Sequence, residues 1–406
     1  MRGAGMTIRA SAAKAAAALA RPARGTQGDR AGSPLTIASI RAIPLTAPMQ
    51  SGTRTSQATY DKVSIVLVEL RTTDGIVGWG ECLGRFGATA YADFINSVLV
   101  PLLLGQDAFA IRRHWLRMRA ALTGRAGGML IEAIAGVDIA LWDVVGKALG
   151  QPVHRLLGGM GRPAVDCYAS SINWADAATM QAQARAVMAM GFKAIKVKLG
   201  RPVEQAIAAA AAVRAATGDG MRLGVDANWA YTLDEALRVG HALHDLGYWF
   251  FEEPIAPEDV AGYAHLRRAL PIMLAAGESD YTVAHAAELV RDRLVGIIQP
   301  DVARAGGISE TRDIATLAQA FHVGYAPHVG WSGAVCVAAS LQLAAAMPAF
   351  TSFECMFIGN PLRDALAHEP VGAASQLADG QLPVPTGPGL GITINLDAVE
   401  RYRVDR

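Results

Sequence analysis

The chain has 406 residues, of which 52% are hydrophobic and 18% charged, and its formal net charge is +1. This composition allows a large buried core in about two domains, and the near-neutral charge argues against nucleic acid or an anionic membrane as a partner. Four scattered cysteines without a Cys-x-x-Cys pair indicate neither a disulfide framework nor a thiolate metal site, and the apolar runs are too interrupted to span a membrane. We therefore expect a cytoplasmic protein.

Residues 1–34 are rich in Ala, Arg and Gly and contain one acidic residue, Asp29. Transit peptides share this Arg-rich, acid-poor composition, but the segment lacks the strongly apolar stretch of a secretory signal. We interpret it as a disordered or targeting-like extension and give it no part in the fold.

Residues 35–160 predict a small α+β domain. Strands are expected to start at 35–37 and to cover 63–71 and 76–82, and helical periodicity follows at 91–104, 108–122 and 128–149. The segment 48–57 is long for a hairpin connection. It is therefore either a mobile lid or an irregular surface loop.

Residues 161–372 alternate short β-rich runs with Ala/Leu-rich helical patterns. The eight predicted strands are 165–170, 194–199, 222–226, 249–252, 272–275, 296–299, 323–326 and 351–354, with helices that include 176–190, 203–216, 233–246 and 308–321. Eight alternating units predict a closed parallel barrel, whose catalytic residues come from the carboxyl ends of the strands. An open doubly wound sheet is the alternative. The sequence has no Gly-x-Gly-x-x-Gly after the first of these strands, which argues against the dinucleotide-binding form of that sheet. Residues 373–406 predict irregular chain with a short strand at 392–395, returning to the first domain.

An ionisable residue stands at the end of each later strand. In chain order these are Lys198, Asp226, Glu252, Glu278, Asp301, His328 and Glu354, at intervals of 28, 26, 26, 23, 27 and 26 residues. One strand–helix unit of a barrel takes about 30 residues. We therefore expect all seven side chains to face the same opening.

Three consecutive strand ends carry carboxylates, at Asp226, Glu252 and Glu278. Three converging anions repel one another and are costly to bury unless a cation joins them. Oxygen ligands favour Mg²⁺, with Mn²⁺ as the alternative, over zinc. We expect Asn228 and Glu253 to support these ligands, and Glu253 is an alternative ligand in place of Glu252.

Groups able to carry protons flank the carboxylates. Lys196 and Lys198 point the same way on a strand, so each lowers the pKa of the other and favours a lysine that acts as a base. The alternative is a half-exposed strand with two solvated lysines. Asp301 beside His328 would orient the imidazole and raise its basicity. Glu354 would either bind a substrate oxygen in its protonated form or pair with Lys196.

This combination suits removal of a proton from the carbon next to a carboxylate. The cation and Lys196 would absorb charge as the substrate becomes an enediolate. Lys198 and His328 would approach from opposite faces, one removing the proton and the other returning a proton or assisting a leaving group.

Several motifs give the chain, from about residue 35 onward, a resemblance to the enolase superfamily and its mandelate racemase subgroup. They are Lys196-Val-Lys198, Asp226-Ala-Asn228, Glu252-Glu-Pro254, Gly277-Glu278, Asp301 with Gly306-Gly307, His328 and Glu354. The resemblance implies a modified TIM barrel, (β/α)₇β, under an α+β capping domain, so the eighth helix would be missing. It also implies Mg²⁺ at Asp226, Glu252 and Glu278, and Lys198 and His328 as the acid/base pair. Loops of the capping domain would choose the substrate.

Finer features separate subgroups of the family. Asp301-Val-Ala-Arg304 stands where muconate-lactonising members have a lysine, and we expect Arg304 to support the site. The segments 78–82, 327–329, 360–363 and 388–391 look most like the sugar-acid members. Arg54 and Trp331 are the expected substrate-binding residues.

The first functional hypothesis is therefore Mg²⁺-dependent dehydration or cycloisomerisation of a sugar acid or its lactone. The alternatives are a racemase or epimerase of a 2-hydroxy acid, and a non-catalytic relative that binds a carboxylate or sugar. The expected partner is a small-molecule carboxylate, and we expect a homo-oligomer.

Overall fold

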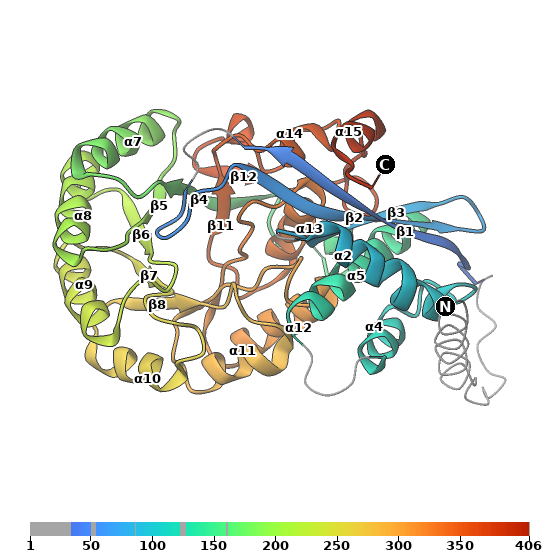
Figure 1. Ribbon diagram of the computed structural model, residues 1–406, viewed down its shortest axis with the longest axis horizontal. Helices are drawn as coiled ribbons and strands as arrows, with labels where there is room; N and C mark the ends of the chain where they lie inside the picture. The colour runs from blue at the N-terminus through green and yellow to red at the C-terminus, as the bar shows by residue number, and fades with distance from the viewer. Residues whose placement is uncertain (1–33, 50–53, 86, 122–126, 160, 406) are drawn as a thin grey trace, which may run out of the picture.

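The computed structural model describes residues 34–49, 54–85, 87–121, 127–159 and 161–405. A sheet-and-helix domain, seen on the right in Figure 1, packs beside a barrel on the left. The predicted extension at 1–34 lies outside the described residues except for Pro34. Among the helices described, none has both the length and the apolar character needed to cross a membrane.

The first domain is a three-stranded antiparallel sheet packed against helices. Its strands lie in the order β1 (Ile37–Pro48), β2 (Lys62–Thr72) and β3 (Val77–Leu83). The helices are α2 (Ala88–Phe94), the π-helix η1 (Ile95–Leu99), α3 (Val100–Leu103), α4 (Ile111–Ala120), α5 (Met129–Ala148) and α6 (Val153–Leu156). The continuous helix predicted at 91–104 is thus three segments, with Pro101, which has no backbone N–H to donate, in the last of them.

Helix α5 joins the two domains. It packs so closely on β3 that a Cβ atom at Gly80 would overlap the backbone oxygen of Gly136. On the barrel side, the Asp138 carboxylate accepts hydrogen bonds from the Ser309 backbone N–H at 2.9 Å and hydroxyl at 2.7 Å. Ser309 lies in the first turn of α12 (Gly307–Ala320), so α5 holds the start of a barrel helix.

The second domain is a barrel of eight parallel strands. They are β4 (Ala164–Ile172), β5 (Ala194–Lys198), β6 (Arg222–Asp226), β7 (Phe250–Glu252), β8 (Met273–Ala276), β9 (Ile297–Ile298), β10 (Gly324–Tyr325) and β11 (Phe353–Met356). Neighbours along the chain pair with each other, β11 pairs with β4, and a parallel bridge from Tyr325 to Phe350 closes the circle. The predicted closed barrel is therefore confirmed.

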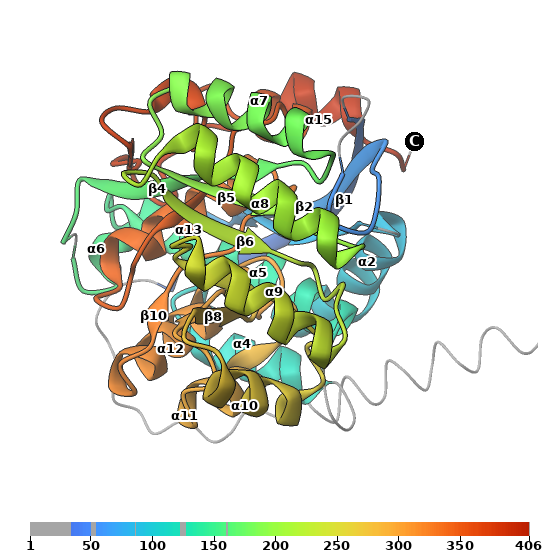
Figure 2. The ribbon, with the colours of Figure 1, turned by 90° about the vertical axis from the view of Figure 1, so that its left-hand side faces the viewer.

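Seven helices cover the outside of the described barrel. They are α7 (Ala177–Ala189), α8 (Val203–Thr217), α9 (Leu233–Asp245), α10 (Val260–Ala269), α11 (Thr282–Arg291), α12 and α13 (Ala334–Ala346), and Figure 2 shows three of them, α7, α8 and α9, side by side over β4, β5 and β6. Directly after β11 the described chain has only the short α14 (Pro361–Ala365) in place of a covering barrel helix, so the (β/α)₇β form is confirmed and a full eighth helix is wrong.

The C-terminal segment returns to both domains. The short η2 (Ala374–Gln376) precedes β12 (Gln381–Pro383), which pairs antiparallel with β4. The strand predicted at 392–395 is wrong: only a single bridge forms, from Ile394 to Ala367. The Asn395 side chain instead accepts hydrogen bonds from the first backbone N–H groups of α15 (Leu396–Tyr402) and caps this helix. After α15, Arg403 forms a bridge with Leu45 of β1.

Candidate active site

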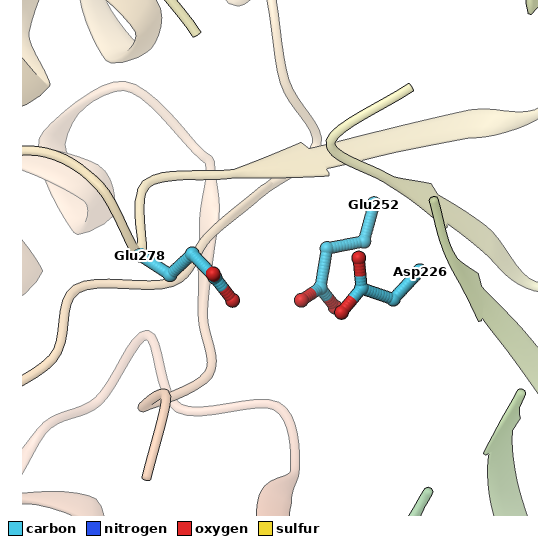
Figure 3. A group of neighbouring side chains, drawn as sticks. All are labelled: Asp226, Glu252 and Glu278. Carbon is cyan, nitrogen blue, oxygen red and sulfur yellow. The ribbon is translucent and has the colours of Figure 1, made fainter. Parts of the chain in front are cut away.

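The carboxyl ends of the strands bring the predicted carboxylates together. Asp226 and Glu252 end β6 and β7 and face each other in the strand register, and Glu278 follows β8 by two residues. One oxygen from each lies within 4.8 Å of the others, and all three side chains are buried. Figure 3 shows the three carboxylates pointing toward a common centre.

This donor set fits a hard divalent cation. Three buried carboxylates supply only oxygen ligands, which suit Mg²⁺ better than zinc. Burial and the nearby Asp226 raise the pKa of Glu252 to about 8, because each negative charge opposes the next. The amide of Gln299, which sequence reasoning missed, donates to Glu252 at 2.7 Å.

Asn228 and Glu253 stand directly behind the carboxylates. Asn228 donates to both Asp226 oxygens, from its backbone N–H at 2.7 Å and its side-chain amide at 3.1 Å. Glu253 is buried, and neither of its carboxyl oxygens has a hydrogen-bond partner. Burial and the charges of Glu278 and Asp226 raise its pKa well above the ordinary value. The converging set contains Glu252 and not Glu253.

Both lysines are buried rather than solvated, with 1% of Lys196 and 8% of Lys198 exposed. Lys196 Nζ lies 2.9 Å from Glu252, and Lys198 forms an ion pair with Asp226. Burial lowers the pKa of Lys198, but the charges of Asp226, Glu278 and Glu252 together outweigh it, and the net pKa is raised. The repulsion from Lys196 expected from the sequence is present but smaller, so the expected net lowering of the lysine pKa is wrong.

His328 and Asp301 form the expected pair. Nδ1 of His328 lies 2.8 Å from Asp301, and Nε2 lies 3.1 Å from Glu278. A parallel bridge between Asp301 and His328 extends the β9–β10 pairing and fixes this geometry. Burial lowers the pKa of His328, but the charges of Glu278 and Glu354, together with the hydrogen bonds to Asp301 and Glu278, outweigh it and raise the pKa to about 10.

Glu354 on β11 is held as an anion. Lys196 Nζ lies 2.8 Å away, and the Ser170 hydroxyl and Val329 backbone N–H donate at 2.7 and 2.8 Å. Burial raises the pKa of Glu354, but Lys196 and His328 outweigh it and lower the pKa to about 2. Of the two roles expected for Glu354, the structure has the ion pair with Lys196.

A single cavity collects these groups beneath a segment of the capping domain. Its empty volume is about 660 Å³, and Lys198, Glu278, His328 and Glu354 line it. The segment after β1 reaches the barrel in Figure 1. Ser56 there donates through its hydroxyl to the Asp226 backbone oxygen at 3.0 Å. Residues 50–53 of the predicted lid lie outside the described residues.

The remaining predicted residues fall in different places. Trp331 lines the cavity, with its ring 6.3 Å from that of Tyr60. Arg54 is exposed and does not line it. Arg304 contacts Glu132 at 3.0 Å, also outside this cavity. Arg85 also lines the cavity, and the sequence analysis did not predict it. Its position two residues after the end of β3 is the signal that could have indicated it.

The fold and this set of carboxylates, lysines and histidine define a barrel enzyme of the enolase type. The family model "Enolase C-terminal domain-like" matches residues 179–398, and "Mandelate racemase / muconate lactonizing enzyme, N-terminal domain" matches residues 38–158. The chain belongs to the enolase superfamily, in its mandelate racemase subgroup, and is a lyase or isomerase.

Curated relatives and a solved structure agree with this assignment. The D-galactarolactone cycloisomerase of Agrobacterium fabrum is 38% identical over 85% of this chain and 93% of its own length. The arabinonate dehydratase of Saccharolobus solfataricus is 36% identical over 84% of this chain and 91% of its own. A mandelate racemase-like protein from Bordetella bronchiseptica has a TM-score of 0.87 and 32% identity, covering 91% of this chain and 95% of its own.

Proposed function

We propose that the chain removes the proton next to the carboxylate of a sugar acid or its lactone, and so catalyses dehydration or cycloisomerisation. The observation that carries the proposal is that Lys198 and His328, two proton carriers, line one cavity with Glu278. The names of the relatives, a sugar-acid lactone cycloisomerase and a sugar-acid dehydratase, support the same substrate class.

Asp226, Glu252 and Glu278 would hold Mg²⁺, with Mn²⁺ as the alternative. When bound, the ion supplies positive charge that stabilises the anion formed at the substrate carboxylate. Lys196, paired with Glu252 and Glu354, adds a fixed positive charge beside this position. Because Lys196 is wholly enclosed, its charge acts in a water-poor environment and is weakly screened.

Lys198 and His328 come from different parts of the barrel, which supports one residue removing the proton and the other returning one. Around the barrel, β5 and β10 are three strand positions apart, so the two side chains reach the cavity from different sides. Asp301 accepts from Nδ1 of His328 and leaves Nε2 on the side of Glu278 and the cavity. One residue takes the α-proton, and the other protonates the oxygen that leaves the β-carbon.

The test is incubation with a panel of aldonic and aldaric acids and their lactones in the presence of Mg²⁺. We expect 2-keto-3-deoxy products from a dehydration, or an isomeric lactone from a cycloisomerisation. Absence of both products across the panel would contradict the proposal.

A second candidate is a racemase or epimerase of a 2-hydroxy acid. It is favoured by the same pair, since two proton carriers on different sides of the cavity can remove a proton from one face and return it to the other. Exchange of the α-proton for deuterium in D₂O, with inversion and without elimination, would select this candidate over the first.

A further inference from the structure

Arg85 is placed where the capping domain meets the cavity. It follows β3 by two residues and lines the cavity together with Lys198 and His328. It also lines an adjoining cavity, with an empty volume of about 650 Å³, which shares Tyr60 and Trp331 with the first. Arg85 therefore stands where these two cavities meet, on the side provided by the capping domain, and it also lines a third cavity that contains Glu132.

Arg85 is half-buried, and it lacks the partners that enclosed arginines have elsewhere among the described residues. Its Nε is buried without a hydrogen-bond partner, and no carboxylate among the described residues pairs with it. Arg304, by contrast, contacts Glu132, and Arg363 donates to the backbone oxygen of Met356. An arginine keeps its charge, and leaving the enclosed Nε of this charged group without a partner is costly. The structure therefore leaves this position for an anionic group.

The other cations of the cavity are already matched. Lys198 pairs with Asp226, and His328 contacts Asp301 and Glu278. Arg85, Tyr60 and Trp331 line both cavities, so a substrate that extends from Lys198 into the second cavity would bring its far end past these three residues. A planar carboxylate matches the fork of an arginine with two parallel hydrogen bonds. One unmatched guanidinium also suits a singly charged carboxylate better than a phosphate dianion.

We propose that Arg85 binds a second carboxylate of the substrate, so that the substrate is an aldaric acid or its monolactone rather than an aldonic acid. This inference rests on the proposed function for the chemistry, but the binding role of Arg85 can be measured separately. Arg85 would determine specificity without touching the reacting carbon.

The first experiment compares kcat/KM for aldaric and aldonic acids of the same configuration. We expect the wild type to favour the aldaric acid, and Arg85→Gln to lower kcat/KM for it by about 10- to 100-fold, the usual range for a lost charge-assisted contact. The aldonic acid should lose much less, and Arg85→Lys should keep part of the preference. Arg238→Gln, on the outer face of α9, is the matched control. Equal losses for both acids, or a wild-type preference for the aldonic acid, would overturn the inference.

The second experiment measures binding without turnover. In a Lys198→Ala background with Mg²⁺, titration calorimetry with the same two acids should give a dissociation constant for the aldaric acid that rises about 10- to 100-fold on adding Arg85→Gln. Thermal unfolding verifies that each variant is folded. An unchanged constant overturns the role of Arg85 whatever the reaction is. A weakened constant in a protein that turns over no acid supports the role of Arg85 and contradicts the proposed function.

Discussion

Replacing Glu252 with glutamine should remove the stabilisation that Mg²⁺ gives to the protein. One oxygen from each of the three carboxylates lies within 4.8 Å of the others, and two unit charges at this distance repel by about 3.5 kcal/mol at an effective dielectric constant of ~20. The raised pKa of Glu252, about 8, means that a proton relieves part of this repulsion at pH 7. Glutamine resembles this protonated form, so the variant should fold, but it removes an anionic ligand.

The expected shift in melting temperature follows from linkage. Mg²⁺ at 100 times its dissociation constant adds about 2.7 kcal/mol to the free energy of unfolding. With an unfolding entropy of ~2.1 cal/mol/K per residue over 406 residues, this is a rise of roughly 3 °C in Tm. Calorimetry of chelator-treated protein, titrated with MgCl₂, measures the shift in the wild type and in Glu252→Gln. Glu204→Gln, an exposed carboxylate on α8, is the matched control and should keep the full rise.

Two results would refute this reasoning. One is a wild type whose Tm does not rise with Mg²⁺ at any concentration. The other is a Glu252→Gln variant that responds as strongly as the wild type, which would mean that the cation binds elsewhere.

Three further predictions concern the proton carriers and the domain contact. Lys198→Ala and His328→Ala should each lower kcat by about 10²- to 10⁴-fold with an unchanged circular dichroism spectrum; near-normal turnover in either would contradict its role. Asp301→Asn should lower kcat and shift its pH profile, because the imidazole loses the charged, acceptor-only partner that fixes its tautomer; an unshifted profile would count against this. Burial raises the pKa of Asp138 from 3.8 to about 7, so the folded state binds the extra proton and stability falls as pH rises across that window, by at most about 4 kcal/mol. Asp138→Asn should flatten this slope in urea unfolding between about pH 4 and 7, and an equally steep slope would contradict the assignment.

The sequence predicted the barrel and the meeting of its strand ends because the (β/α) unit repeats. A residue at the same place in each unit must face the same opening, so Asp226, Glu252 and Glu278 could be grouped without coordinates. The start of α12 at Gly307, one residue from the prediction, reflects the same regularity.

What the sequence could not predict depends on contacts between distant segments. Arg85 and Ser56 come from the capping domain, and no local pattern tells which of its residues reach the barrel mouth. Gln299 is a neutral residue within a predicted strand, so a search for regularly spaced charged residues could not identify it. The pKa of Lys198 depends on how closely Asp226 approaches, a distance that strand spacing does not give.

Loss of the α-proton to solvent tests the central claim most directly. The sample is wild-type protein with Mg²⁺ and a sugar acid that it turns over, in D₂O, and the reaction is followed by NMR. Deuterium should enter the substrate or product only at carbons that lose or gain a proton in the proposed transfers. A chelator, or the double variant of Lys198→Ala with His328→Ala, should reduce this incorporation to the uncatalysed level. Incorporation that persists at the wild-type rate in the double variant would contradict the assignment of these two residues as the proton carriers.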